Sequence, residues 1–156
     1  MNKNIKLVAT DIDGVWTDAR MHYTKDGDFM KSFSTYDGMG VEMLRNKNIE
    51  TVIMTSENSD IVLQRAKKLK IKEVHINEQN KLERLKKICL DKKIELNEVA
   101  YIGDDINDIE VLKNVGLSAL TNNSPIKQQI KVDYITEKKG GDGAFREFAE
   151  LILKEK

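Results

Sequence analysis

Residues 5–14 read Ile-Lys-Leu-Val-Ala-Thr-Asp-Ile-Asp-Gly, and this stretch decides the fold. Its first six residues are mostly apolar or β-branched, which favours a short strand buried on both faces of a sheet. The run then stops at two aspartates and a glycine, which favour a polar loop. The stretch therefore predicts a buried strand whose carboxyl end delivers Asp11 and Asp13 to a loop.

The rest of the chain alternates similar short apolar runs with segments of helical apolar spacing. Strands joined by helices of this length predict a parallel sheet with helices on both faces, a doubly wound, Rossmann-like α/β fold. The further strands are expected at residues 50–54, 73–76, 98–102, 116–119 and 133–135, and the helices at residues 38–46, 59–69, 80–92, 107–114 and 143–153.

Residues 19–34 break this alternation. Alternating side chains flank the sequence Lys-Asp-Gly-Asp at residues 25–28, and an Asp-Gly pair is a strong turn signal. We therefore expect a β-hairpin inserted just after the first strand. The remaining length leaves no room for a second folded unit, so residues 1–156 are expected to form one domain.

The composition excludes several classes of function. The 156 residues carry 26 basic and 26 acidic side chains, so no overall charge attracts nucleic acid or a membrane surface. No apolar run approaches the roughly 20 residues that cross a bilayer, and the polar residues 1–6 do not resemble a signal peptide. The single cysteine, Cys89, falls among apolar helix positions, which predicts a core residue in a reducing compartment. The cytoplasm is the expected location.

Polar side chains follow several of the expected strands at their carboxyl ends. In open parallel sheets, ligands bind beyond these ends, near the switch in strand order. Carboxylates gathered there repel one another unless a cation lies among them, and Mg²⁺ with oxygen ligands resolves that conflict. The residues expected at this edge of the sheet are Asp11, Asp13, Thr55, Ser56, Lys81, Asp104 and Asp105.

Four ordered motifs resemble those of the haloacid dehalogenase superfamily. Residues 11–18 read Asp-Ile-Asp-Gly-Val-Trp-Thr-Asp and resemble its first motif. Thr55, Lys81 and the run Gly-Asp-Asp-Ile-Asn-Asp at residues 103–108 fall where its second, third and fourth motifs are expected. The resemblance covers nearly the whole chain and implies the fold of that superfamily.

The resemblance implies a phosphatase that works through an aspartyl-phosphate. Asp11 would attack phosphorus, and Asp13 would protonate the leaving oxygen and then deprotonate the attacking water. Aspartate at position 13 is typical of the phosphatases, whereas dehalogenases and phosphonate-cleaving members differ there. Mg²⁺ would be held by Asp11, by the backbone carbonyl of Asp13 and by Asp104.

The remaining motif residues are expected to bind phosphate or to tune the site. Thr55 and its neighbour Ser56 would lie against the phosphoryl oxygens, and Lys81 would supply fixed positive charge. Asp105 would hold a water of the metal or orient Lys81. Asn107 would reach the phosphate or, alternatively, cap a helix.

With a short hairpin in place of a cap domain, the chain resembles the capless branch of the superfamily. The opening motif, the hairpin, the run Asp-Gly-Met-Gly at residues 37–40 and the glycine-rich tail at residues 139–147 resemble phosphatases of 3-deoxy-2-ulosonic acid phosphates. These act on eight-carbon acids in lipopolysaccharide synthesis or on nine-carbon acids of the sialic-acid type. The resemblance implies a homotetramer in which the tail contributes to a neighbour's site. Arg146 would then pair with a substrate carboxylate, although an ordinary surface arginine is an open alternative.

The segment after the second motif departs from the eight-carbon enzymes, which typically have Thr-Gly-Arg there. This chain reads Thr55-Ser56-Glu57, so an anion replaces a cation. Nine-carbon members resemble this chain in placing glutamate there and lysine on the following helix. We therefore expect Glu57, Arg65 and Lys68 to select the substrate, with a nine-carbon acid 9-phosphate favoured and an eight-carbon acid 8-phosphate next. A surface role for Glu57 and Lys68 is the alternative.

Other classes of function stay open. The same fold occurs as a non-catalytic regulatory or assembly module related to domains of sugar-nucleotide transferases, but such a module would not need the complete set of motif residues found here. A phosphorylated protein is an alternative substrate, because an uncapped site is accessible. A mutase is disfavoured by the missing cap, and a phosphonatase by Asp13.

Overall fold

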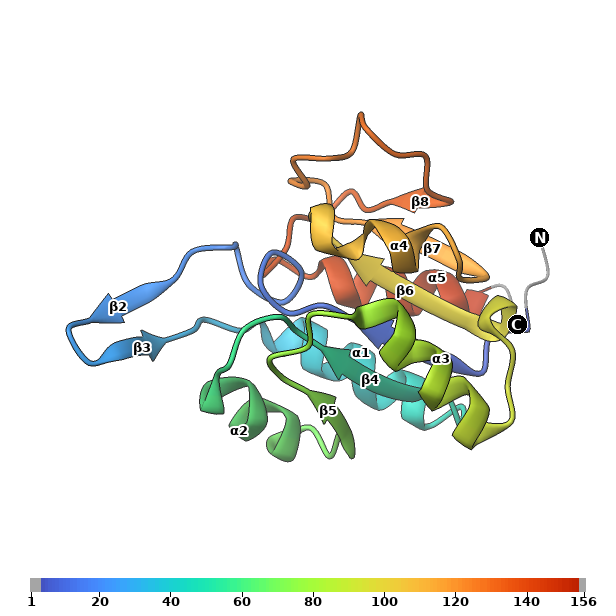
Figure 1. The fold of residues 1–156 in the computed structure, drawn as a ribbon, viewed down its shortest axis with the longest axis horizontal. Coiled ribbons are helices and arrows are strands. Elements are labelled where there is room, and N and C mark those ends of the chain that lie inside the picture. The colour runs from blue at the N-terminus through green and yellow to red at the C-terminus, as the bar shows by residue number, and fades with distance from the viewer. Residues whose placement is uncertain (1–3, 155–156) are drawn as a thin grey trace.

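The computed structural model describes residues 4–154 and confirms the predicted α/β architecture (Figure 1). Six parallel strands form one sheet in the order β5-β4-β1-β6-β7-β8. The chain runs outward from β1 in one direction through β4 and β5, and in the other through β6, β7 and β8, so the strand order switches beside β1. The strands are β1 (Leu7–Thr10), β4 (Glu50–Met54), β5 (Glu73–His75), β6 (Val99–Gly103), β7 (Leu117–Leu120) and β8 (Tyr134–Ile135).

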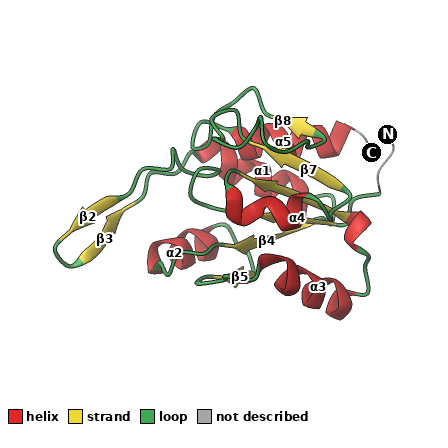
Figure 2. Cartoon of the chain, turned by 45° about the horizontal axis from the view of Figure 1, so that its top comes forward, coloured by secondary structure: helices red, strands yellow, loops and turns green. Residues whose placement is uncertain are grey.

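Helices cover both faces of this sheet (Figure 2). One apolar cluster joins the sheet to α1, α2 and α5, and a second joins it to α3 and α4. Alternate residues of β4 enter the two clusters: Ile53 packs in the cluster with α1, α2 and α5, and Val52 in the cluster with α3 and α4. This explains why the strand is apolar at nearly every position. The helices are α1 (Thr35–Arg45), α2 (Asp60–Lys68), α3 (Lys81–Lys92), α4 (Ile109–Leu112) and α5 (Ala144–Lys154), with short 3-10 turns η1 (Leu96–Glu98) and η2 (Ile106–Asp108).

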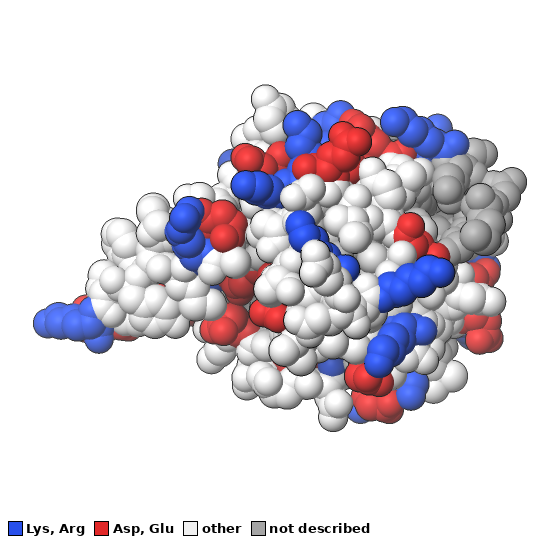
Figure 3. All heavy atoms as spheres, turned by 90° about the horizontal axis from the view of Figure 1, so that it is seen from above, with Lys and Arg blue, Asp and Glu red and all other residues white. Residues whose placement is uncertain are grey.

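The predicted hairpin is confirmed and consists of β2 (His22–Thr24) and β3 (Gly27–Met30). Its turn is closed by Gly27, which has a φ of +110° that side chains rarely adopt. The hairpin extends away from the body of the molecule (Figure 1), and the described residues contain no separate cap domain. Most of its surface is uncharged, and acidic side chains gather where it joins the body (Figure 3).

Four details bear on the predictions. The helix expected at residues 107–114 is divided into η2 and the four-residue α4. Cys89 is buried, as predicted, in the cluster beneath α3. Among residues 4–154 no helix is long and apolar enough to cross a membrane. Residues 1–3, which begin the stretch judged unlike a signal peptide, lie outside the described residues.

Candidate active site

The loop after β1 holds Asp11 in a fixed, buried orientation. Asp11 is only 5% exposed, and its Oδ1 accepts a hydrogen bond from the backbone N–H of Ile12 at 2.8 Å. The indole of Trp16 donates to Thr10 Oγ1 at 3.1 Å and packs against Phe145, with ring centroids 4.8 Å apart. The loop that carries the first motif is thereby fixed to the core on both sides of the aspartate.

Gly14 allows the fourth motif to approach this loop. Its φ is +87°, and a Cβ there would lie 1.8 Å from Asp104 Oδ2. Only glycine combines this backbone conformation with this space. The glycine-rich tail approaches the same loop, because a Cβ on Gly140 would lie 1.9 Å from the carbonyl oxygen of Gly14. The first motif is thus packed between Asp104 and the tail of its own chain.

Lys81, at the start of α3, connects Asp11 to a second buried acid, Asp108. Its Nζ lies 3.1 Å from Asp11 Oδ1 and 2.7 Å from Asp108 Oδ1. Burial alone would lower the pKa of Lys81, but these two carboxylates outweigh it and raise the pKa. The lysine is therefore held as a cation beside the expected nucleophile.

Asp108 is fully buried and has a structural part in the site. Its Oδ1 accepts hydrogen bonds from Lys81 at 2.7 Å and from the hydroxyl of Tyr101 at 2.5 Å. Its Oδ2 accepts from the backbone N–H of Asp104 at 2.8 Å and of Asp105 at 3.2 Å. With both oxygens in use, Asp108 fixes the fourth motif and Lys81, which leaves Asp11 and Asp104 as the carboxylates open to a metal.

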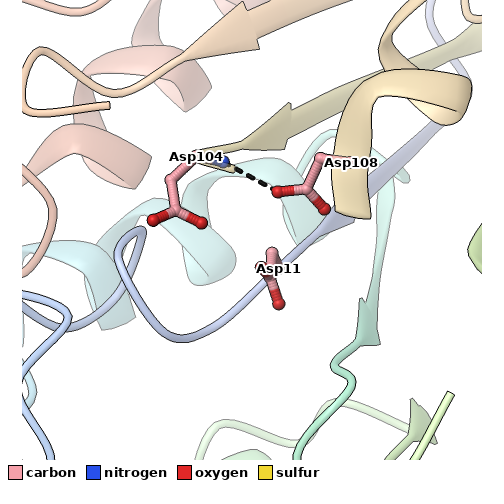
Figure 4. Close-up of side chains that lie close together, drawn as sticks. All are labelled: Asp11, Asp104 and Asp108. Carbon is pink, nitrogen blue, oxygen red and sulfur yellow. Dashed lines mark hydrogen bonds between the residues drawn. The ribbon is translucent and has the colours of Figure 1, made fainter. Parts of the chain in front are cut away.

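Oxygen atoms of Asp11, Asp104 and Asp108 lie within 4.8 Å of one another, and Figure 4 shows the three side chains converging from β1, β6 and η2. Burial, followed by repulsion from Asp108, raises the pKa of Asp11 to about 7. Burial, followed by repulsion from Asp11 and Asp108, raises the pKa of Asp104 to about 8. Carboxylates that resist ionisation in this way form a donor set suited to a hard divalent cation such as Mg²⁺.

Asp13 points toward the hairpin and pairs with Lys31. The Lys31 Nζ lies 2.7 Å from Asp13 Oδ1 and 3.7 Å from Asp28 Oδ2, and the lysine side chain is only 1% exposed. Burial would lower the pKa of Lys31, but Asp13 and then Asp28 raise it above its usual value. Asp13 is thus held by a residue of the hairpin that the sequence analysis did not identify.

Three of the four expected phosphate-binding residues line a cavity of about 200 Å³ beyond the carboxyl ends of the strands, and the fourth, Lys81, contacts Asp11 in its wall. Thr55 is buried at the end of β4, and its Oγ1 accepts from the backbone N–H of Glu57 at 3.3 Å. Ser56 and Asn107 meet directly, since the Asn107 amide donates to Ser56 Oγ at 2.9 Å. The residues lining the cavity are Asp11, Asp13, Ala19, Thr55, Ser56, Glu57, Asp104, Asp105 and Asn107.

Two alternatives stated for the fourth motif need correction. Asp105 does not orient Lys81: Asp105 Oδ1 accepts from the backbone N–H of Ile106 at 2.8 Å, and Asp108 makes the contact with the lysine. The other alternative, that Asp105 holds a water of the metal, stays a prediction. Asn107 is not a helix cap either, because it lies inside η2, whose N-cap is Asp105. Asp108 closes the sequence Gly-Asp-Asp-Ile-Asn-Asp, so its position was visible in the sequence although its role was not.

Three predicted residues lie outside this cavity. Arg65 donates to the backbone carbonyl of Ser34 at 3.1 Å and lies over the ring of Phe33. Lys68 is exposed at the last position of α2. Arg146 lies on α5, where its Nε donates to Glu150 Oε1 at 2.7 Å. Within one chain, Glu57 is therefore the only one of the four predicted selectivity and tail residues that the described structure places in the cavity.

Comparisons with known proteins identify the family of the chain. Residues 47–148 match the family of haloacid dehalogenase-like hydrolases. The chain is 34% identical over 152 residues to the 3-deoxy-D-manno-octulosonate 8-phosphate phosphatase KdsC of Haemophilus influenzae, covering 97% of this chain and 84% of the relative.

Solved structures extend the similarity to the whole fold. One of them is the phosphatase of the same name from Moraxella catarrhalis, solved with a magnesium ion, a phosphate ion and a KDO molecule. It superposes with a TM-score of 0.94 and is 37% identical in sequence, and the match covers 99% of this chain and 89% of that one. The cobalt-bound form of the Haemophilus influenzae enzyme superposes with a TM-score of 0.94 at 34% sequence identity, and the match covers 99% of this chain and 90% of that one. The predicted resemblance is confirmed.

Proposed function

This chain belongs to the haloacid dehalogenase-like hydrolases, and we propose that it is a Mg²⁺-dependent phosphatase of 3-deoxy-2-ulosonic acid phosphates. One observation carries the proposal. Asp11 lies buried, 3.1 Å from the Lys81 ammonium and beside Asp104, at the switch in strand order, with Asp13 two residues further along the chain. This arrangement provides a nucleophile, a fixed cation, metal ligands and an acid–base group at one cavity.

The residues suit an in-line transfer in two steps. A carboxylate oxygen of Asp11 forms a bond to phosphorus as the ester P–O bond breaks, and the leaving oxygen takes a proton from Asp13. A water that then loses its proton to Asp13 attacks the aspartyl-phosphate, which releases inorganic phosphate and restores Asp11. Bound Mg²⁺, held by Asp11, Asp104 and the Asp13 carbonyl, would offset the charge on the phosphoryl group. Lys81 and Thr55 would bind the phosphoryl oxygens from the other side.

Within this substrate class we favour a nine-carbon acid 9-phosphate. Glu57 supports this choice because it lies in the cavity, where a carboxylate can accept hydrogen bonds from sugar hydroxyls. The phosphatases named above are named for the eight-carbon octulosonate 8-phosphate, which is the alternative substrate. Arg65 and Lys68 lie outside the cavity of their own chain, so their part in selection requires a neighbouring subunit.

A homotetramer would bring such a neighbour. The hairpin supports association because Tyr23 is 63% exposed and Phe29 66% exposed on an element that extends from the body. Large exposed aromatic side chains grouped in this way are typical of subunit contacts. Light scattering coupled to size exclusion tests this directly: the native chain should elute as a tetramer and Phe29→Asp as a smaller species.

Phosphate release from a substrate panel tests the proposed function. The panel contains the eight-carbon 8-phosphate, two nine-carbon 9-phosphates with and without the N-acetyl group, and hexose phosphates as controls. We expect Mg²⁺-dependent turnover of the sugar-acid phosphates, with kcat/KM about tenfold higher for a nine-carbon acid, equal to about 1.4 kcal/mol. Preference for the eight-carbon acid would retain the reaction and reject the selectivity argument. No turnover with any ester would instead favour the regulatory module.

A further inference from the structure

The hairpin buries one charged side chain that the two steps above do not use. Lys31 follows directly after β3, and its side chain is 1% exposed, although neighbouring hairpin residues such as Phe29 and Met30 are exposed. A lysine ammonium is rarely buried without a specific partner, because leaving water costs several kcal/mol. This burial therefore indicates that the ion pairs of Lys31 are part of the site.

The pairs of Lys31 connect three separate segments of the chain. Its Nζ lies 2.7 Å from Asp13 Oδ1 in the first-motif loop and 3.7 Å from Asp28 Oδ2 in the hairpin. The same Asp28 Oδ2 accepts a hydrogen bond from the hydroxyl of Ser59, the N-cap of α2, at 2.8 Å. Ser59 makes no capping bond of its own with its hydroxyl, so this group is committed to the hairpin. The network fixes Lys31 from both sides and leaves it little freedom to move.

The two oxygens of Asp13 are thereby made different. Oδ1 is held by Lys31, whereas Oδ2 is buried and has no hydrogen-bond partner among the described residues. Asp13 lines the cavity that also contains Asp11 and Asp104. Lys31 therefore anchors the carboxyl group through one oxygen, since the other oxygen has no partner of its own among residues 4–154.

We propose that Lys31 is a positioning residue for the acid–base group: by holding Asp13 Oδ1 it fixes the direction in which the carboxyl group meets the ester oxygen. The inference rests on the proposed phosphatase function. As the P–O bond breaks, a proton moves from the Asp13 carboxyl group to the leaving oxygen, and in the second step a water proton returns to that group. Lys31 keeps its own protons throughout and touches neither substrate nor metal. The hairpin therefore contributes to catalysis in its own subunit, in addition to any contact between subunits.

This role has a consequence that a purely structural lysine lacks. A sugar alkoxide leaves only with a proton, whereas p-nitrophenolate is a stable anion and leaves without one. Misplacing Asp13 should therefore slow the cleavage of a sugar-acid phosphate much more than the release of p-nitrophenolate from p-nitrophenyl phosphate. Loss of folded protein would lower both rates by the same factor. Loss of assembly would remove a neighbour's contacts with the sugar acid, so light scattering must show that each variant has the native assembly.

The experiment compares these two esters in the native protein and four variants, in saturating Mg²⁺. Lys31→Met removes the ammonium, Lys31→Arg retains a cation, and Asp13→Asn removes the acid. Lys47→Met is the matched control, at an exposed position that does not line the cavity. The sugar ester is the one that the native protein turns over fastest, and p-nitrophenolate is recorded as a pre-steady-state burst. Thermal melting shows that each variant is folded.

We expect Lys31→Met to lower kcat for the sugar ester by about 10²-fold, the loss that a displacement near 1 Å can cause, with little change in KM. The burst rate with p-nitrophenyl phosphate should fall by less than about fivefold, as in Asp13→Asn. Lys31→Arg should restore part of the sugar-ester rate relative to the p-nitrophenyl phosphate rate. Lys47→Met should match the native protein. Equal losses on both esters would overturn the role of Lys31, while a native protein inactive on both would overturn the proposed function itself.

Discussion

Replacing Gly14 with alanine tests whether the close approach of the first and fourth motifs is needed for catalysis. The new Cβ would lie 1.8 Å from Asp104 Oδ2, where real Cβ contacts almost never fall under 3.0 Å, so the carboxylate must retreat by about 1.2 Å. Mg²⁺ requires ligand distances near 2.0–2.1 Å in an almost ideal octahedron, and a ligand displaced this far is lost. A misplacement of this size also costs about 10²-fold in rate.

The chain supplies a matched control for the backbone strain. Gly27 also has a positive φ, +110°, but a Cβ there meets no atom within 4 Å. Both Gly14→Ala and Gly27→Ala should lose about 1–2 kcal/mol of unfolding free energy from the left-handed conformation. Only Gly14→Ala should also lose about 10²-fold in Mg²⁺-dependent kcat/KM and bind Mg²⁺ more weakly.

The assay combines urea unfolding with phosphate release over a magnesium titration. If Gly14→Ala retained kcat/KM within about threefold of Gly27→Ala, the position of Asp104 against the loop would not matter. The assignment of Asp104 as a metal ligand would then be wrong.

Three further predictions follow from the charges. Burial raises the pKa of Asp37 to about 6, so the folded protein holds this proton more tightly than the unfolded chain does. The free energy of unfolding should therefore fall by roughly 2–3 kcal/mol from pH 4 to pH 7. Asp37→Asn should flatten this dependence of unfolding free energy on pH, measured by urea unfolding, and an unchanged slope would contradict the prediction. Carboxylates must ionise to bind Mg²⁺, and the pKa values of Asp11 and Asp104 are about 7 and about 8. The rise in Tm on adding Mg²⁺ should therefore grow between pH 6 and 8.5, and a constant rise would contradict this prediction. Glu57→Ala and Lys68→Ala should each reduce the preference between nine- and eight-carbon esters, and identical kcat/KM ratios in all three proteins would reject their role in selection.

The alternation of strands and helices was readable because the central strands β4, β1, β6 and β7 are buried on both faces and the longer helices on one. The run at residues 50–54 coincides with β4, and the first strand begins at Leu7, two residues later than expected. The first helix begins at Thr35, three residues before the predicted start, because Ser34 Oγ accepts from the N–H of Tyr36 as a cap. The local pattern of apolar residues is enough to predict that such elements exist, whereas capping decides at which residue a helix begins.

Contacts between distant segments explain what the sequence analysis missed. Asp108 accepts from the backbone of Asp104 and Asp105, which turns the chain into η2 and shortens the expected helix to α4. The pairing of Lys31 with Asp13 depends on how the hairpin leaves the sheet, which no spacing within residues 19–34 reveals. The aspartates and Lys81 were predictable because each follows a strand, and strand ends meet at one edge.

The most direct test of the central claim is to trap phosphate on Asp11. Asp13→Asn mixed with p-nitrophenyl phosphate and Mg²⁺ should release one p-nitrophenolate per site in a burst, because this leaving group needs no proton while the variant cannot activate water. Mass spectrometry after acid quenching should then find the phosphoryl group on Asp11. A label on another residue such as Thr55, or an equal burst after Asp11 is also changed to asparagine, would contradict the account.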